Sequence, residues 1–418
     1  MTALTGHSLL AAIVFCTASI CADESSLASS PTPASSKSPA KEPNWLTGGS
    51  VTIGGIFSPH FHFGSIYGGT TADELPEIGH HDPRMDGWTI QGFEFGMSGR
   101  FTPDIEAFGA FHLFYDNETE AWGHEFEEWF AKIKNLPGGL ELRGGRYLNR
   151  FGFHNPTHEH GWSFVDTNLV NGRFLGDDGL YTIGGEVSWK VPVSWTSMLS
   201  VSLGVPPAAE EHHHEDEGTE PEFEAGGAMF DDVFVVANWT NNFDYDDFHQ
   251  FRAGASGAWG ENKWGKTSQI YGIHFEYQWR QNGYEVGGRY FRWRTEAMLR
   301  SFGAVSGHLP GEEVAHDEEE HEEKPHAATL DEFGMYSAIA YGFDNGIELG
   351  LRGDFVSGIA RAGLDERFRV SPAVTYYLNK NHTMYLRAQY NFDHSNDFGT
   401  EHSVWGQVGI NWGGPEVR

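Results

Sequence analysis

Residues 383–392 read TMYLRAQYNF, and apolar side chains alternate along them with polar ones. The residues of the apolar face are Met384, Leu386, Ala388, Tyr390 and Phe392. The residues of the other face are Thr383, Tyr385, Arg387, Gln389 and Asn391. A period of two is that of a β-strand, in which successive side chains point to opposite faces. This pattern predicts a strand that faces lipid on one side and a polar lumen on the other.

The same alternation recurs along the chain, most clearly in 270–280, 347–355 and 403–412. Counting such segments gives sixteen candidate strands, at 50–63, 88–101, 105–116, 124–134, 140–151, 182–190, 196–205, 231–240, 248–259, 268–280, 284–295, 332–343, 347–357, 367–378, 383–393 and 402–412. Bacterial single-chain outer-membrane barrels have an even number of strands, and the weak signal of each segment leaves a range of about 12 to 18. We therefore expect an all-β fold, a transmembrane antiparallel β-barrel.

The links between candidate strands alternate in length. After even-numbered strands they are short and carry turn residues, as in TPD at 102–104, QNG at 281–283 and DNG at 344–346. Asn-Gly is a residue pair of tight hairpin turns. After odd-numbered strands the links are usually longer, up to residues 296–331. Short turns on one rim and long loops on the other are typical of an outer-membrane barrel, with the turns in the periplasm and the loops outside the cell.

The composition fits this fold and narrows the partners. The chain has 53 Gly, 31 Phe, 15 Tyr and 14 Trp. After residue 22 it has no run of eighteen apolar residues, which excludes a transmembrane helix from the mature chain. The formal net charge of −32 makes nucleic acid an unfavourable partner and favours a cationic ligand.

The chain divides into four segments. Residues 1–22 form the expected signal peptide of a Gram-negative exported protein, with the apolar core LLAAIVFCTASI at 9–20 and cleavage after Ala22. Both cysteines lie in this segment. Residues 23–44 are rich in Ser, Pro and Ala and are expected to be a disordered leader. The barrel is expected at 45–413 and a short tail at 414–418. Such barrels commonly end on an aromatic residue that the barrel-assembly machinery recognises. Here Trp412 closes the last strand but GGPEVR follows, a departure that we interpret as a short tail.

Histidines and acids gather in the predicted outer loops, for example EEHHHEDE at 210–217. Imidazole and carboxylate are ligands of zinc, and copper and nickel also accept imidazole. The candidate metal ligands are His80, His81, His154, His158, His160, His212, His213, His214, His308, His316, His321 and His326. The competing interpretation is that acidic surface loops merely tolerate these histidines.

Acids and bases also alternate on the predicted lumen face. The candidate pore-lining residues are Glu276, Arg280, Glu285, Arg289, Glu348, Arg352, Asp354 and Arg387. Facing charges can filter solutes in a pore, and they can equally be paired supports of the wall. No spacing singles out a nucleophile beside an oriented His or a pair of carboxylates, so we do not expect an enzyme.

Residues 138–180 resemble a family of proteobacterial outer-membrane proteins described as zinc-regulated outer-membrane receptors. The matching residues are Gly145, Arg146, Tyr147, Arg150, Phe151, Gly152, Asn155, Pro156, His158, His160, Phe164, Val165, Asp166, Gly172, Arg173, Phe174, Leu175 and Gly176. The close match covers about a tenth of the chain. The family is often called TonB-dependent, but a plug domain and about twenty-two strands do not fit this sequence. What the resemblance implies is a connection with zinc. Physically, residues 152–180 are well placed to fold inward and narrow the pore.

These observations predict an outer-membrane channel or receptor for divalent metal cations, zinc first, whose His- and acid-rich extracellular loops capture the metal. The alternative is a general or solute-selective porin with incidental His-rich loops, and a non-transporting adhesin or surface metal sponge also stays open. No cofactor is required, and Zn²⁺ is expected as ligand or substrate. The expected partners are outer-membrane lipid, divalent cations and the assembly machinery, and a homo-oligomer is left open.

Overall fold

The computed structural model describes residues 52–72, 79, 81–83, 86–116, 121–207, 223, 229–285, 287–306, 327–396 and 399–413. The predicted signal peptide, leader and C-terminal tail lie outside these residues. No helix among the described residues is long and apolar enough to cross a membrane.

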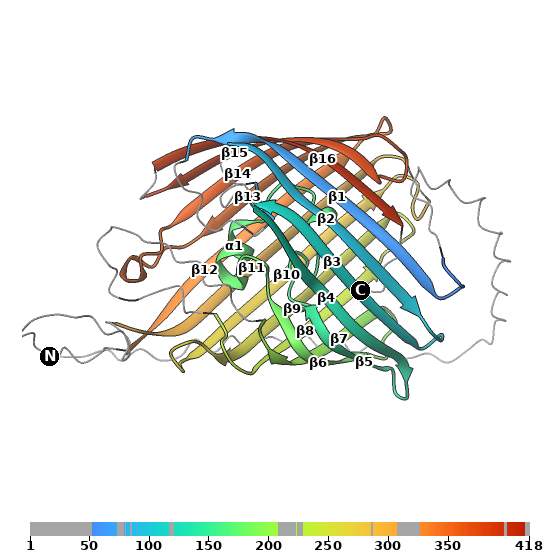
Figure 1. Ribbon diagram of the computed structural model, residues 1–418, viewed down its shortest axis with the longest axis horizontal. Coiled ribbons are helices and arrows are strands. Elements are labelled where there is room, and N and C mark those ends of the chain that lie inside the picture. The colour runs from blue at the N-terminus through green and yellow to red at the C-terminus, as the bar shows by residue number, and fades with distance from the viewer. Residues whose placement is uncertain are drawn as a thin grey trace, which may run out of the picture. The chain divides into compact units, whose positions relative to one another are not determined.

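Sixteen antiparallel strands form a closed barrel in which every strand pairs with its neighbours in sequence and β1 pairs with β16 (Figure 1). The strands are β1 (Phe57–Thr70), β2 (Gly87–Arg100), β3 (Ile105–Asp116), β4 (Ala121–Leu136), β5 (Leu140–Leu148), β6 (Tyr181–Lys190), β7 (Thr196–Val205), β8 (Phe234–Asp244), β9 (His249–Glu261), β10 (Thr267–Arg280), β11 (Tyr290–Val305), β12 (Ala327–Gly342), β13 (Ile347–Val356), β14 (Arg367–Tyr377), β15 (Met384–Ser395) and β16 (Gly399–Gly413). The predicted all-β barrel of sixteen strands is therefore confirmed. The short helical segments are η2 (Glu159–Gly161), α1 (Leu169–Leu175) and η3 (Ala360–Ala362).

β1 and β11 begin well after the positions that the sequence pattern predicts. β1 was expected at 50–63, but Gly54 and Gly55 adopt φ angles of 62° and 71° in a turn that precedes the strand. β11 was expected at 284–295, but the turn before it continues through Gly288, which has a φ of 83°. Glycine tolerates a positive φ that other residues rarely adopt, so these turns end where the glycines end.

The two faces of the wall follow the predicted alternation. On β15, Leu386 is 45% exposed on the outer face, whereas Arg387 is 4% exposed on the inner face. Aromatic side chains are exposed near both rims, as with Trp88 beside the long loops and Tyr245 beside the short turns. An apolar band flanked by aromatic residues is the lipid-facing surface of a transmembrane barrel. The chain is an outer-membrane β-barrel, with short periplasmic turns and long extracellular loops.

The barrel interior holds charged side chains together with one large apolar cluster. In this cluster, residues of α1 such as Leu169 and Phe174 pack against wall residues such as Val236 and Met298. Figure 1 shows α1 inside the ring of strands. The apolar cluster therefore attaches the segment between β5 and β6 to the inner wall, where it positions the candidate site.

Candidate functional site in the barrel lumen

Residues 149–180, which connect β5 to β6 and are called the inner loop below, fold into the barrel. The side-chain amide of Asn155 closes the base of the loop with two hydrogen bonds. Asn155 Nδ2 donates to the carbonyl oxygen of Asn149 over 2.8 Å, and Asn155 Oδ1 accepts from the Leu180 backbone amide over 2.7 Å. Asn168 caps α1, because its Oδ1 accepts from the Asn171 backbone amide over 3.0 Å. The inward fold predicted for residues 152–180 agrees with the structure.

Asp166 attaches the far part of the inner loop to the wall of β13–β15. Arg352 Nη2 donates to Asp166 Oδ1 over 2.9 Å, and Arg369 Nη1 donates to Asp166 Oδ2 over 3.1 Å. The amides of Gln389 and Asn391 donate to the same carboxylate over 2.7 Å each. Burial alone would raise the pKa of Asp166, but Arg352 and Arg369 lower it to about 2. The carboxylate is therefore charged and fully hydrogen-bonded at neutral pH.

Further donors hold the loop at the same wall. Arg387 donates to the carbonyl oxygens of Trp162 over 2.8 Å and Phe164 over 3.0 Å. Asp82, from the loop between β1 and β2, accepts from the Thr167 backbone amide over 2.8 Å. Burial and the negative charge of Asp166 raise the pKa of Asp82 to about 7. The inner loop thus runs from β5 across the lumen to β13–β15.

Histidines and glutamates alternate along one line of the inner wall formed by β1–β4, which β16 separates from β15. The strand register pairs His62 of β1 with Glu94 of β2, Glu94 with His112 of β3, and His112 with Glu125 of β4. We call these four residues the His/Glu row. All four point into the barrel, because paired residues of neighbouring strands lie on the same face of a sheet. The row therefore places imidazole and carboxylate groups side by side.

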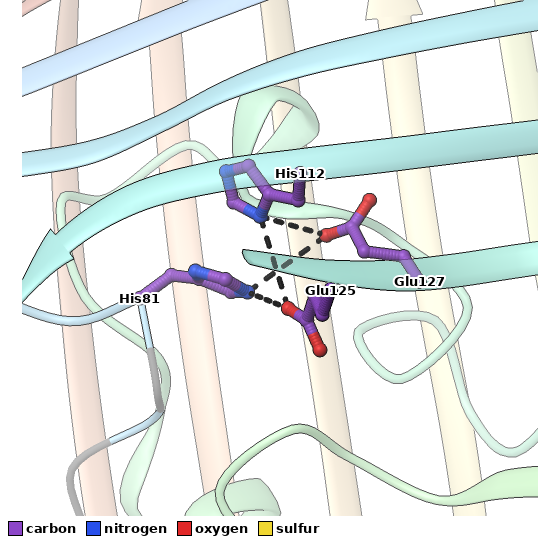
Figure 2. Close-up of side chains that lie close together, drawn as sticks. All are labelled: His81, His112, Glu125 and Glu127. Atoms are coloured by element: carbon purple, nitrogen blue, oxygen red, sulfur yellow. Dashed lines mark ion pairs between the residues drawn. The ribbon is translucent and has the colours of Figure 1, made fainter. Parts of the chain in front are cut away.

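Residues from two loops lie over this row. His81, from the β1–β2 loop, has its Nε2 3.2 Å from Glu125 Oε1 and 3.8 Å from Glu127 Oε1 (Figure 2). His112 Nδ1 lies 3.1 Å from the same Glu127 oxygen. From the inner loop, His158 Nδ1 lies 3.2 Å from Glu127 Oε2.

His160, also from the inner loop, meets the other end of the row. Its Nδ1 lies 2.9 Å from Glu94 Oε2, and its ring stacks on His62 with centroids 3.6 Å apart. Three groups of ligand atoms within 4.8 Å of one another result: His81, His112, Glu125 and Glu127; His62, Glu94 and His160; and Glu94, Glu127, His158 and Glu159. Imidazole and carboxylate in such groups can bind a metal ion, or they can form ion pairs when the imidazoles are protonated.

Without a bound metal, two loop histidines of the clusters favour the protonated state. Burial lowers the pKa of His81, but the hydrogen bond with Glu125 and the charge of Glu159 outweigh it and raise the pKa to about 10. Burial also opposes the charge on His158, yet Glu127 and Glu128 raise its pKa well above the ordinary value. The carboxylates therefore stabilise a positive charge at this site, whether a proton or a metal ion carries it.

The predicted metal ligands divide into three groups. His81, His158 and His160 lie in the lumen clusters. His154 does not: its Nε2 is 2.9 Å from Thr167 Oγ1, and burial together with Arg352 lowers its pKa to about 3. The remaining candidates lie outside the described residues, and they are His80, His212, His213, His214, His308, His316, His321 and His326.

The predicted pore-lining residues all face the interior or its periplasmic mouth. Glu276 accepts from Arg252 over 3.1 Å and from Arg294 over 2.7 Å, and Arg352 donates to Asp354 over 2.8 Å. Residues near the periplasmic turns line a cavity of about 230 Å³, and they include Arg280, Glu285, Arg289 and Glu348. Arg387 is engaged by the inner loop. Several of these charges therefore support the loop and the wall as well as facing the lumen.

A second cavity of about 450 Å³ lies between the inner loop and β4–β9. Its lining includes Glu128, Arg150, Phe153 and Arg252. Arg150 Nε lies 3.6 Å from Glu186 Oε1, so the charges of this cavity are also partly paired. The cavity beside the loop therefore has both charged and apolar lining residues, and it is large enough for water and small solutes.

Sequence reasoning missed the wall residues of the clusters. These are His62, Glu94, His112, Glu125 and Glu127. A signal was present in PHFHF at 59–63, where the histidines alternate with phenylalanines as inward residues do. Strand register, which brings the four strands of the row together, is not readable from one segment alone.

The motif that carries the family resemblance forms the inner loop and its attachments. Asn155 closes the loop base, His158 and His160 reach the His/Glu row, and Asp166 reaches β13–β15. Arg173 Nη1 donates to the carbonyl oxygens of Ser357 over 3.0 Å and Asp365 over 2.7 Å. Each of these motif residues thus helps to hold the loop inside the barrel.

No protein-family model matches the chain. A protein of Aquifex aeolicus (strain VF5), described as uncharacterized, is 35% identical over 81 residues, which are 19% of this chain and 17% of that protein. The match thus spans less than a fifth of the relative's length. The connection with zinc-regulated receptors receives no specific support from these comparisons and stays a prediction.

Solved structures of similar fold come from outer-membrane barrels. An anion-selective porin of Comamonas acidovorans has a TM-score of 0.54 and 10% identity, covering 85% of this chain and 99% of the porin. OmpF of Salmonella typhi, in complex with daunomycin, has a TM-score of 0.51 and 12% identity, covering 87% of this chain and all of OmpF (100%). At these identities the likeness concerns the fold, a porin-like barrel of sixteen strands in the outer membrane.

Proposed function

We propose that this barrel is a channel for small hydrophilic solutes across the outer membrane, narrowed by the inner loop. The observation that carries this proposal is the open interior: a cavity of about 450 Å³ beside the loop and one of about 230 Å³ near the periplasmic turns, both lined in part by charged residues. A barrel of sixteen strands is wide enough to leave an aqueous channel when nothing fills it. Here the loop occupies part of that width, so solutes must pass beside it.

We further propose that divalent metal cations, with zinc first, are among the solutes that the channel takes up. The histidine and carboxylate clusters of the lumen favour this substrate over an uncharged one, since they offer the ligands that zinc prefers. Arginines such as Arg150 and Arg252 line the cavity of about 450 Å³ beside the inner loop. They are consistent with the alternative function, a general porin that also passes anionic solutes. Selectivity measurements distinguish these two solute classes.

Purified protein in planar lipid bilayers is expected to give discrete conductance steps. We expect Zn²⁺ at micromolar concentration to reduce the current, because the ion would bind beside the inner loop, whereas Mg²⁺ at the same concentration leaves the current unchanged. Reversal potentials in a salt gradient then report cation or anion selectivity. A folded protein that gives no steps contradicts the channel, and a current indifferent to Zn²⁺ favours the general porin.

The predicted outer ligands are tested by a six-fold variant in which His212, His213, His214, His316, His321 and His326 are replaced by Ala. Isothermal titration is expected to show fewer bound Zn²⁺ ions per chain, because imidazole is lost. Ca²⁺ binding is expected to persist, because the carboxylates remain and Ca²⁺ prefers oxygen ligands. Unchanged Zn²⁺ stoichiometry would show that these histidines do not bind the metal.

A further inference from the structure

We infer that the inner wall of β1–β4 holds a transition-metal site formed by His81, His112, Glu125 and Glu127, which shared carboxylates connect to two further His/Glu clusters. The inference deepens the proposed function by naming where in the lumen the metal binds. Metal binding at this site can be measured without the channel. Only the direction in which the metal moves rests on the proposed channel function.

The spacing of the ligand atoms fits one small ion. Two ligands bound to Zn²⁺ at about 2.0–2.1 Å in tetrahedral geometry are about 3.3 Å apart. His81 Nε2 and Glu125 Oε1 are 3.2 Å apart, and His112 Nδ1 and Glu127 Oε1 are 3.1 Å apart. The cross distances from His81 to Glu127 and from His112 to Glu125 are 3.8 Å and 3.9 Å. Figure 2 shows the four side chains converging on one point.

The polar neighbours of the buried His112 ring are carboxylates. The side chain is 0% exposed, and among the described residues neither ring nitrogen makes a hydrogen bond of normal geometry. Its nitrogens instead face carboxylates, with Nδ1 toward Glu127 and Nε2 3.6 Å from Glu159 Oε1. A buried imidazole surrounded by carboxylate oxygens is expected to hold either a proton or a metal ion.

Gly92 of β2 makes the space for this imidazole. A Cβ atom at position 92 would overlap the His112 ring, whereas a Cβ atom at Gly109 of β3 would meet nothing within 4 Å. The wall is therefore shaped around the His112 side chain. A Gly92→Ala substitution displaces His112 without removing any ligand, and Gly109→Ala is its matched control.

The three clusters share carboxylate residues, so an ion bound at one cluster lies next to the ligands of another. Glu127 belongs to the first cluster and to the cluster of His158 and Glu159, and Glu94 connects that cluster with His62 and His160. His81 comes from an extracellular loop, whereas the other ligands lie on the wall and the inner loop. A metal ion can therefore exchange one ligand at a time while it moves inward from the loop rim.

The composition of the clusters argues for a transition metal over Ca²⁺ or Mg²⁺. Each cluster contains at least one imidazole, which suits zinc, copper and nickel, whereas Ca²⁺ and Mg²⁺ prefer all-oxygen sites. The alternative is that the histidines are protonated and form ion pairs with the same carboxylates. Metal binding by the isolated protein distinguishes the two arrangements.

The test uses the full chain, folded in detergent, with the six loop histidines replaced by Ala so that those side chains bind no metal. Isothermal titration with Zn²⁺ on this parent is expected to show residual binding. The substitutions His112→Ala, Glu127→Gln and Gly92→Ala are each expected to weaken that binding at least about tenfold, since even partners that only orient a ligand contribute that much. Gly109→Ala and His402→Ala, at an exposed position of β16, are expected to bind as the parent does.

His81→Ala keeps the test decisive if a wall variant does not fold, because His81 lies in the β1–β2 loop, outside every strand. Folding is checked by the slower gel migration of the boiled protein. Unchanged Zn²⁺ affinity in folded His81→Ala and Gly92→Ala would overturn the site and leave ion pairs in its place. Zn²⁺ binding without conductance would contradict the proposed channel and support the metal site. Conductance without Zn²⁺ binding would support the channel and contradict the metal site.

Discussion

Deletion of residues 155–176 is expected to raise the single-channel conductance several-fold. These residues include η2, α1 and Asp166, which occupy the lumen between the His/Glu row and β13–β15. Without them, the sixteen-stranded wall encloses a wider aqueous path. The measurement is the size of the current steps in planar bilayers, compared with the full chain under the same salt.

The deletion is informative only in a barrel that still closes. A folded variant migrates differently before and after boiling, and its circular dichroism spectrum remains that of a β-protein. The wall does not depend on the loop for its hydrogen bonds, because each strand pairs with its neighbours through the backbone. If the folded deletion conducts as the full chain does, the inner loop is not the constriction, and the narrowest point lies elsewhere.

Asp166→Asn is expected to lower the temperature at which the folded gel band is lost and to make the current noisier. The substitution removes the charge that Arg352 and Arg369 stabilise, which frees the far part of the inner loop. The fall of the Asp166 pKa from 3.8 to about 2 corresponds to a stabilisation on the order of 2 kcal/mol at neutral pH. Asp354 and Asp393 still pair with the two arginines, so the barrel itself is expected to fold.

The stability difference between the wild type and Asp166→Asn is expected to depend on pH with a definite sign. Because the pKa of Asp166 is lower in the folded protein than its ordinary 3.8, the stabilisation is fully present above pH 3.8 and is lost as the pH falls toward 2. The stability difference between the wild type and Asp166→Asn is therefore expected to be largest near pH 5. It is smaller above pH 7, where Asp82 is charged beside Asp166, and it vanishes as the pH falls below 4.

The matched control is Asp344→Asn, because the Asp344 side chain is 62% exposed and lies 3.4 Å from Arg289 in a turn. An exposed ion pair contributes little, so this variant should resemble the wild type at every pH. If Asp166→Asn shows no loss of stability at neutral pH, Asp166 does not hold the inner loop in the way the structure indicates.

Much of the barrel could be predicted from local patterns, because each strand reports its own orientation. The alternation around Arg387 and Gln389 assigns the inner face without knowledge of any neighbour, and turn residues such as those at 344–346 mark the hairpins. Strand starts were less certain. At β11 three glycines prolong the preceding turn, and their positive φ angles are a property of the folded backbone rather than of a residue count.

The lumen site could be predicted only in part. His158 and His160 were found because they stand in a motif, but His112 and Glu94 look like ordinary inward residues of their strands. Their proximity arises from the register of β1–β4, and a register shift of one residue would turn the side chains to the other face. His154 shows the converse: it stands in the same motif, yet the loop turns its ring toward Thr167 and Trp162.

The path of the inner loop also has a mechanical consequence for the barrel. β5, where the loop begins, and β13, where Arg352 holds Asp166, are eight strands apart in the closed ring of sixteen and so lie on opposite sides of it. A segment attached at both ends of a diameter opposes any change in that diameter. The loop therefore connects opposite walls of the barrel. We expect it to resist deformation of the barrel's cross-section by the lateral pressure of the surrounding lipid.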